Sequence, residues 1–284
     1  AAGFIQVFEA STFFPVQRIP AWGKAVFALA FSPDGSALAA CDYAGQLKIF
    51  DTRTWQASHE LSIGKGCERL AFSSQAKLAI AGTPRTPAGH HSLWLYDLNT
   101  RSLSSPLIST PADTRYLSAL DFNTAGDHLA VGSSNRQKGV EVFKVNGQRL
   151  QSVKKIPTAG DVSSVSFSPN DEYLAGSSNA DLNLWKWRTG QRFWSVPFRT
   201  GSGKFLSALD FAPDGQSIAA CGTGRGVPVN IYRTGNGKLQ QSLGEVRSMN
   251  CNGIRFSSDG QSLFTVRQVF SNFNEKIIDR YDLR

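Results

Sequence analysis

One pattern occurs six times in this chain, and it limits the fold more than any other feature. Each copy has a short apolar segment that ends in Phe, then a tight turn, then a second segment rich in Leu, Ile, Ala and Gly. The Phe residues are spaced 41, 50, 45, 44 and 45 residues apart. Several short strands that recur with a period of about 45 residues predict a stacked or radial repeat fold. The anchor residues are Phe31, Phe72, Phe122, Phe167, Phe211 and Phe256.

Each repeat is predicted to hold four strands, named a to d here. Strand a ends at the anchor Phe, and strand b is the small-residue segment after the turn. Strand c alternates apolar and polar residues, as a half-buried antiparallel strand does, and strand d is the most polar. This gradient puts strand a innermost and strand d at the rim of a four-stranded sheet. Strands c are expected at residues 47–51, 93–97, 140–144, 182–186 and 229–233, and strands d at residues 56–63, 103–109, 149–156, 192–198 and 238–246.

The repeats resemble WD repeats, with Phe-Ser-Pro-Asp-Gly-x-x-Leu-Ala at residues 31–39 followed by Leu-Lys-Ile-Phe-Asp at residues 47–51. The resemblance covers nearly the whole chain and implies a β-propeller, usually of seven blades. Two features of the family are missing. No Gly-His pair precedes strand a, and the Asp of the b–c turn is mostly replaced. These degenerate blades are therefore expected to depend on apolar packing rather than on a buried polar network.

The two ends of the chain leave the number of blades open. Residues 4–9 match a strand c and residues 14–20 a strand d, whereas residues 277–283 match a strand c with no strand d after it. Six blades would result if residues 14–20 completed the last blade. Seven would result if one blade is incomplete, and we favour seven. We predict an all-β, single-domain propeller over residues 1–284. The chain begins with Ala1 rather than Met, which leaves a removed leader or a preceding domain open.

The cysteines do not show the spacing of a metal site. Cys41 and Cys221 fall at the ends of small-residue strands, and Cys67 and Cys251 each stand five residues before an anchor Phe. No Cys-x-x-Cys pair occurs. We therefore expect all four to be reduced and structural, which favours a cytoplasmic protein. No apolar run approaches the length of about 20 residues that a transmembrane helix needs.

Nothing in the sequence indicates catalysis, a cofactor or a metal. The Gly-rich stretches at residues 222–226 and 199–204 do not lead from a strand into a helix, as phosphate-binding loops must. His90 and His91 are expected to be solvated loop side chains, and no motif for nucleophilic catalysis surrounds any histidine. The repeated aspartates of the a–b turns are interpreted as turn residues that bond their own backbone. These are Asp34, Asp214 and Asp259.

The chain carries a net charge of +8 and has a pI near 9.5. In a propeller, the b–c and d–a loops share one face, called the loop face here, and basic residues outnumber acidic ones in those loops. The c–d turns at the rim of the opposite face are also basic. No Lys/Arg run or basic patch with interleaved aromatics occurs. A solvated surface explains this spread, and an acidic partner or a nucleic acid is the alternative.

These observations predict a non-catalytic interaction scaffold or docking module that binds a protein or peptide through the loop face. The loops at residues 82–92, 133–139, 222–228 and 267–275 are the longest and least repetitive. Two alternatives stay open. The first is a binder of nucleic acid or phospholipid, whose binding would be sensitive to salt; the second is a propeller enzyme such as a lactonase, lyase or hydrolase, which needs converging carboxylates, His or metal ligands. Aromatic and Arg side chains concentrate binding energy, so the candidate partner-binding residues are Trp22, Arg85, Tyr116, Arg136, Arg225 and Arg267.

Overall fold

The computed structural model describes residues 4–20, 25–64, 66–82, 91–109, 117–134, 139–178, 181–198, 205–224, 227–246, 249–269 and 272–283. All regular structure in these residues is β-strand. No helix in them is long and apolar enough to cross a membrane. The chain divides into two compact units, residues 1–117 with 146–150, and residues 118–145 with 151–284. The single-domain prediction stays a prediction.

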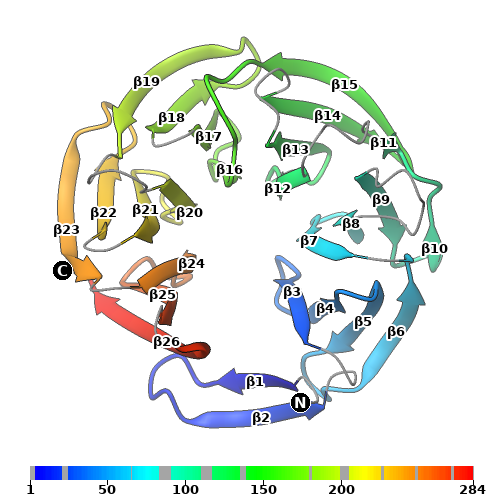
Figure 1. Ribbon diagram of the computed structural model, residues 1–284. Helices are drawn as coiled ribbons and strands as arrows, with labels where there is room; N and C mark the ends of the chain where they lie inside the picture. Colours follow the sequence, from blue (N-terminus) through cyan, green and yellow to red (C-terminus); the bar gives the residue numbers. More distant parts are fainter. Residues whose placement is uncertain are drawn as a thin grey trace. The chain divides into compact units, whose positions relative to one another are not determined.

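The first unit contains a two-stranded hairpin and two larger antiparallel sheets (Figure 1). In each larger sheet the strands lie in chain order, with strand a at one edge. The predicted strand d of the second sheet is interrupted and forms two short pieces, both paired with β9. The strands are β1 (Phe4–Phe8) and β2 (Pro15–Pro20) in the hairpin; β3 (Val26–Phe31), β4 (Ala37–Asp42), β5 (Gln46–Asp51) and β6 (Ala57–Ser62); and β7 (Cys67–Phe72), β8 (Lys77–Gly82), β9 (Ser92–Asp97), β10 (Ser102–Leu103) and β11 (Ile108–Ser109).

The second unit holds most of the remaining strands, again in a-b-c-d order except that the last group has only strands a, b and c among the described residues (Figure 1). The last two sheets are joined by a short pairing of β21 with β24. The strands are β12 (Leu117–Phe122), β13 (His128–Ser133), β14 (Val140–Asn146) and β15 (Arg149–Ile156); β16 (Val165–Phe167), β17 (Tyr173–Ser178), β18 (Asp181–Lys186) and β19 (Gln191–Pro197); β20 (Phe205–Phe211), β21 (Ser217–Gly224), β22 (Val227–Arg233) and β23 (Leu239–Val246); and β24 (Met249–Phe256), β25 (Ser262–Val269) and β26 (Asn272–Asp282).

The prediction of an all-β fold built from four-stranded antiparallel sheets is confirmed. The predicted strands at both ends also form, as β1, β2 and β26. Among the described residues, β1 and β2 make a sheet of their own. The number of blades stays a prediction.

The a–b turns form as the sequence predicts. In the first of them, the Asp34 carboxylate accepts hydrogen bonds from the Ser32 hydroxyl at 2.6 Å and from the Ser36 amide at 3.1 Å. Donation from Ser32, followed by that from Ser36, lowers the pKa of Asp34 to about 2. Gly35 follows with a φ of 72°, a conformation that glycine adopts without strain. This aspartate therefore shapes a turn.

The anchor Phe residues belong to the core with one exception. Four of them are buried, namely Phe72, Phe122, Phe167 and Phe211. Phe256 is half-buried and packs against the cluster that contains Ile254 and Leu263. Phe31, at the end of β3, is 55% exposed, so its predicted place in the core is wrong. Phe72, Phe167 and Phe211 join clusters in which a strand a packs against a neighbouring sheet.

Candidate functional site on the loop face

The structure describes only part of the predicted binding surface. Trp22, Arg85, Tyr116, Arg136 and Arg225 lie outside the described residues, as do residues 83–90, 135–138, 225–226 and 270–271 of the four variable loops. Arg267 is the one predicted site residue that the structure places. The strand ends beneath these loops are described. They are the starts of the a strands and the ends of the b strands.

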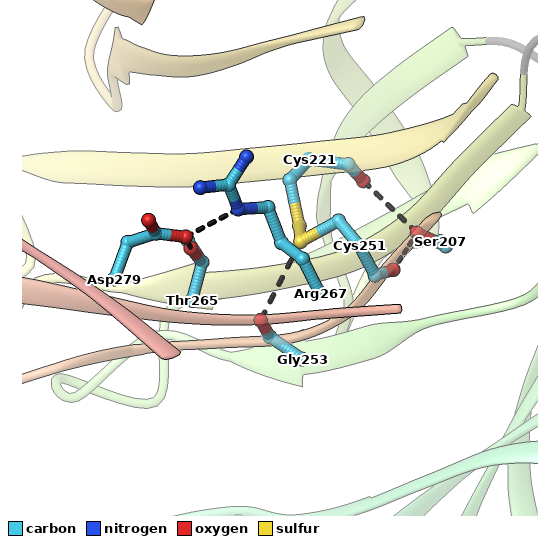
Figure 2. Close-up of a disulfide and its surroundings, with 7 residues drawn as sticks. All are labelled: Ser207, Cys221, Cys251, Gly253, Thr265, Arg267 and Asp279. Atoms are coloured by element: carbon cyan, nitrogen blue, oxygen red, sulfur yellow. Dashed lines mark hydrogen bonds and ion pairs between the residues drawn. A yellow bond between two sulfur atoms is a disulfide. The ribbon is translucent and has the colours of Figure 1, made fainter. Parts of the chain in front are cut away.

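Arg267 lies on β25 and contacts the neighbouring strand rather than open solvent. Its Nε donates to a carboxylate oxygen of Asp279 on β26 (Figure 2). The Thr265 hydroxyl donates to the same oxygen at 3.3 Å. The Arg267 side chain is 14% exposed. It therefore ties the two strands together, and its guanidinium is already paired.

A disulfide lies beside this ion pair (Figure 2). It joins Cys221, near the end of a strand b, to Cys251, near the start of the next strand a, with 5.9 Å between the Cα atoms. A second disulfide in the first unit joins Cys41 to Cys67 in the same way, with a Cα–Cα distance of 6.0 Å. Both distances lie within the range that a disulfide can span.

The expectation that all four cysteines are reduced is wrong. Cys41 and Cys221 follow the anchor Phe of their sheet by 10 residues, and Cys67 and Cys251 precede theirs by five. The end of a strand b and the start of the next strand a meet between neighbouring sheets, so the repeat itself aligns each pair. Disulfides are typical of oxidising compartments. The cytoplasmic location therefore stays a prediction, and the cysteines no longer support it.

Serine hydroxyls link successive sheets at the same strand ends. Ser207 donates to the backbone carbonyl of Cys251 at 2.5 Å (Figure 2). Ser163 donates to the carbonyl of Leu206 at 2.6 Å, and Ser118 donates to that of Val162. Each serine stands four residues before its anchor Phe, and each acceptor stands five residues before the next anchor. These hydrogen bonds, called the serine ladder here, fix the spacing of neighbouring sheets beneath the loop face.

Aspartates make a second ladder at the opposite ends of the a strands. The Asp121 carboxylate accepts from the Phe167 amide at 2.7 Å, and Asp210 accepts from the Phe256 amide at 2.8 Å. Arg255 also pairs with Asp210 at 2.9 Å. Burial raises the pKa of Asp121 to about 7, although the Phe167 amide and the charge of Arg255 oppose that rise. Each aspartate stands directly before an anchor Phe.

A repeated sequence motif marks residues of both ladders, and the spacing of the anchor Phe residues alone does not reveal it. The hexapeptide Leu-Ser-Ala-Leu-Asp-Phe occurs twice, at residues 117–122 and 206–211. Its Ser and Asp are the ladder residues. An identical hexapeptide in two otherwise divergent repeats indicates that its polar side chains serve the same purpose in both.

One histidine also differs from expectation. His91 is 6% exposed rather than solvated. It directly precedes β9, in which every residue is buried. Its Nδ1 lies 3.8 Å from a carboxylate oxygen of Glu68, and burial lowers the pKa of the imidazole while the charge of Glu68 opposes that effect. His90 lies outside the described residues. In the described part of the chain, no group of three or more His, Cys, Asp or Glu side chains is placed to hold a metal ion.

Two tryptophans of strands c belong to the buried scaffold. Trp94 in β9 and Trp185 in β18 are each 4% exposed. Trp55, between β5 and β6, is half-buried and packs against the cluster that contains Ile5 and Ile19.

Comparisons with known proteins agree with this geometry. A family model described as WD domain, G-beta repeat matches residues 13–51 and 150–186. Each match covers the consecutive strands d, a, b and c, from β2 to β5 and from β15 to β18. WD repeat-containing protein JIP5 from Phaeosphaeria nodorum (strain SN15) is 25% identical over 268 residues, which is 82% of this chain and 61% of that protein. This chain therefore spans less than two thirds of that relative.

A solved structure supports the fold independently. A chain in the Crystal Structure of Mitotic Checkpoint Complex superposes with a TM-score of 0.78 at 15% identity, over 99% of this chain and 82% of that chain. At this identity the likeness concerns the fold alone.

Proposed function

Because this chain is a WD-repeat β-propeller, we propose that it is a non-catalytic docking module that binds a protein or peptide through its loop face. WD repeats support an interaction scaffold in general. The identity of the partner and the face that binds it are the proposal.

The proposal rests on the disulfides and hydrogen bonds that connect neighbouring sheets beneath the loop face. Both disulfides and the serine ladder lie at the starts of a strands and the ends of b strands. These are the strand ends from which the variable loops emerge. A rigid base lowers the entropy that the loops lose when they bind a partner. The a–b turns at the other ends of these strands are short and similar, so they offer a ligand less to recognise.

Arg267 stays a candidate, although a partner would have to compete with Asp279 for its guanidinium. The proposal therefore relies first on the five other candidates. Among them, Arg136 and Arg225 lie in loops of different repeats, so a partner that spans the loop face would contact both.

The test compares charge reversals on the two faces. The loop pair is Arg136→Glu with Arg225→Glu. The rim pair is Arg149→Glu with Arg192→Glu, two exposed residues of β15 and β19. Proteins captured from an extract of the source cells are compared for both variants and the parent chain, at low and high salt. We expect the loop pair to lose the captured partner while the rim pair retains it.

The opposite result would refute the choice of face. If the rim pair abolishes capture and the loop pair does not, the basic rim becomes the binding surface. Steep salt dependence together with capture of RNA or DNA would favour the anionic-ligand alternative, because phosphate contacts release counterions. Melting temperatures of both variants provide the control for folding.

A further inference from the structure

The c–d turns change the sign of their charge between repeats. In the first unit strand c ends in Asp, and this carboxylate pairs with a cation of its own sheet. Asp51 pairs with Arg53 at 3.3 Å, and Asp97 pairs with the lysine that begins β8. At the corresponding place in the second unit, β18 ends in Lys186 and β22 ends in Arg233. The carboxylate that neutralises the turn in the first unit is therefore replaced by a further cation.

Six cations gather around these two turns, and among the described residues none of them forms an ion pair. Glu172 and Asp214 add two exposed carboxylates from the a–b turns at the same strand ends. The carboxylate of Asp171 already accepts from the amides of Thr124 and Ala125, at 2.8 and 3.2 Å. The surface therefore carries an excess of positive charge. The six cations, called the basic turns here, are Lys154, Lys186, Arg188, Arg192, Arg233 and Lys238.

Contacts between sheets join the basic turns into one surface. Lys154 of β15 reaches the turn of the following sheet, where its Nζ donates to the carbonyl of Thr189 at 3.1 Å. Trp194 of β19 makes the equivalent contact one sheet further on. Its Nε1 donates to the carbonyl of Thr234 at 2.7 Å, and its ring lies against Gly237. Each strand d thus touches the c–d turn of the next sheet, and the cations of successive sheets lie next to one another.

Arg188 is held in place before any partner binds. Its guanidinium lies over the ring of Trp187, 4.4 Å from the ring centroid, and donates to the carbonyl of Asp171 at 2.6 Å. Trp187 donates to the same carbonyl at 2.9 Å. A guanidinium has five N–H donors, so others stay available. Because its position is already fixed, Arg188 loses little conformational freedom when it binds a carboxylate.

Phosphate groups are poorly matched to this surface. The amides of Thr189 and Gly190 donate to the carbonyl of Lys186, at 3.1 and 2.8 Å, and the amide of Gly237 donates to that of Arg233 at 2.8 Å. These amides are therefore directed into their own turns. Phosphate sites in proteins commonly add outward-pointing backbone N–H groups to cationic side chains. Side-chain cations without such amides suit separate carboxylates better.

The apolar side chains beside the cations favour a protein over a nucleic acid. Trp187 is 3% exposed and is covered by Arg188, so it offers no open face on which a base could stack. Phe193 and Leu239, at the starts of β19 and β23, are instead 41% and 55% exposed. Phe193 also stacks on Tyr173, with 5.3 Å between the ring centroids. Arginine together with exposed aromatic side chains is typical of protein interfaces.

We propose that the basic turns dock an acidic segment of another protein. Its Asp and Glu side chains pair with the six cations, and its apolar side chains contact Phe193 and Leu239. Several pairs act together, because a single exposed ion pair contributes little. The c–d turns lie at the strand ends opposite the loop face. The proposal therefore does not depend on binding at the loop face, and both surfaces can be occupied at once.

Fluorescence anisotropy of a labelled peptide that repeats Asp-Asp-Leu tests the proposal, with a peptide that repeats Asn-Asn-Leu as the uncharged control. We expect only the acidic peptide to bind. Its affinity should fall about tenfold in Arg188→Gln with Arg233→Gln. The matched variant Lys48→Gln with Arg53→Gln removes the same charge from cations that are already paired. It should bind the acidic peptide as tightly as the parent chain does.

Two further variants separate recognition from folding and from net charge. Lys186→Gln with Lys238→Gln changes side chains that make no hydrogen bond among the described residues, so it should weaken the peptide without lowering the melting temperature. Phe193→Ser with Leu239→Ser leaves the net charge unchanged and should also weaken the peptide, because apolar contacts contribute to a protein interface.

Three results would overturn the proposal. The first is an acidic peptide that binds no better than its uncharged control. The second is an equal loss of affinity in the basic-turn variants and in the matched variant, because net charge alone would then explain binding. The third is single-stranded oligothymidylate that binds more tightly than the acidic peptide and is lost in Arg188→Gln with Arg233→Gln, because a nucleic acid would then be the occupant.

Discussion

The two disulfides give the most direct quantitative test of the structure. Each closes a loop between neighbouring sheets, with sequence separations of 26 and 30 residues. The loop-closure relation gives about 3.5 kcal/mol of stabilisation for either loop, from the entropy removed from the unfolded chain. Unfolding entropy of about 2.1 cal/mol/K per residue amounts to about 0.6 kcal/mol/K over 284 residues. Loss of one disulfide should thus lower the melting temperature by about 6 °C.

The perturbation is the pairwise replacement Cys221→Ala with Cys251→Ala, compared with Cys41→Ala and Cys67→Ala. Alanine avoids the cost of a buried hydroxyl, since all four cysteines are almost fully buried. Equilibrium unfolding in guanidinium chloride under non-reducing conditions measures each loss. Reduction of the parent protein should lower its stability toward that of a chain without both pairs, and should have about half that effect on either variant.

Two results would refute this reasoning. The first is a thiol titration of the unreduced, denatured parent that finds four free thiols, which would mean that the pairs do not form. The second is a loss under about 1 kcal/mol for both pairs, well below the usual range for native disulfides. The first result would mean that the disulfides are absent. The second would mean that they form but stabilise the fold less than loop-closure entropy predicts.

Three further outcomes follow from packing and charge. Phe167→Ala or Phe211→Ala should each lower the free energy of unfolding by about 3–5 kcal/mol, whereas Phe31→Ala should change it by no more than about 0.5 kcal/mol. Chemical denaturation measures this contrast, and equal losses at all three sites would contradict the burial pattern. Deletion of residues 1–20 should uncover the surface beneath Ile5 and Ile19 and cause aggregation or a large fall in melting temperature; a truncated chain as stable as its parent would show that the hairpin is dispensable. The folded pKa of Asp121, about 7, lies above its unfolded value of 3.8, so the folded state binds the extra proton and stability falls as pH rises between those values. The stability of Asp121→Asn relative to the parent should rise over that interval in unfolding measurements at several pH values, and a constant difference would argue against a raised pKa.

The strands could be predicted well because the residues that determine each strand lie within the same repeat. The turn after the anchor Phe, the small-residue strand and the alternating strand are local patterns, and the described residues show them where expected. The interruption of the strand at residues 103–109 is a local exception. Pro106 lies between its two pieces, and proline cannot donate to a strand ladder.

The errors concern contacts between repeats. Cys41 and Cys67 are 26 residues apart, and nothing local to either shows that a strand end of one sheet meets a strand start of the next. Phe31 has the same local sequence pattern as the buried anchors, yet the described sheet before it in the chain has only two strands. Burial of a repeat residue thus depends on the neighbouring sheet as much as on its own pattern. The candidate site was the least predictable part, because loops that vary between repeats carry no periodic signal.

The two ladders have a consequence for how such a chain can diverge by duplication. In the serine ladder the acceptor is a backbone carbonyl, and in the aspartate ladder the donor is a backbone amide. Nearly every residue supplies these groups, so the receiving repeat can mutate freely at those positions. Only the repeat that carries Ser and Asp must keep them. A copied repeat therefore carries the Ser and Asp side chains that bond it to a new neighbour. Adjacent repeats can then diverge in sequence without losing their alignment.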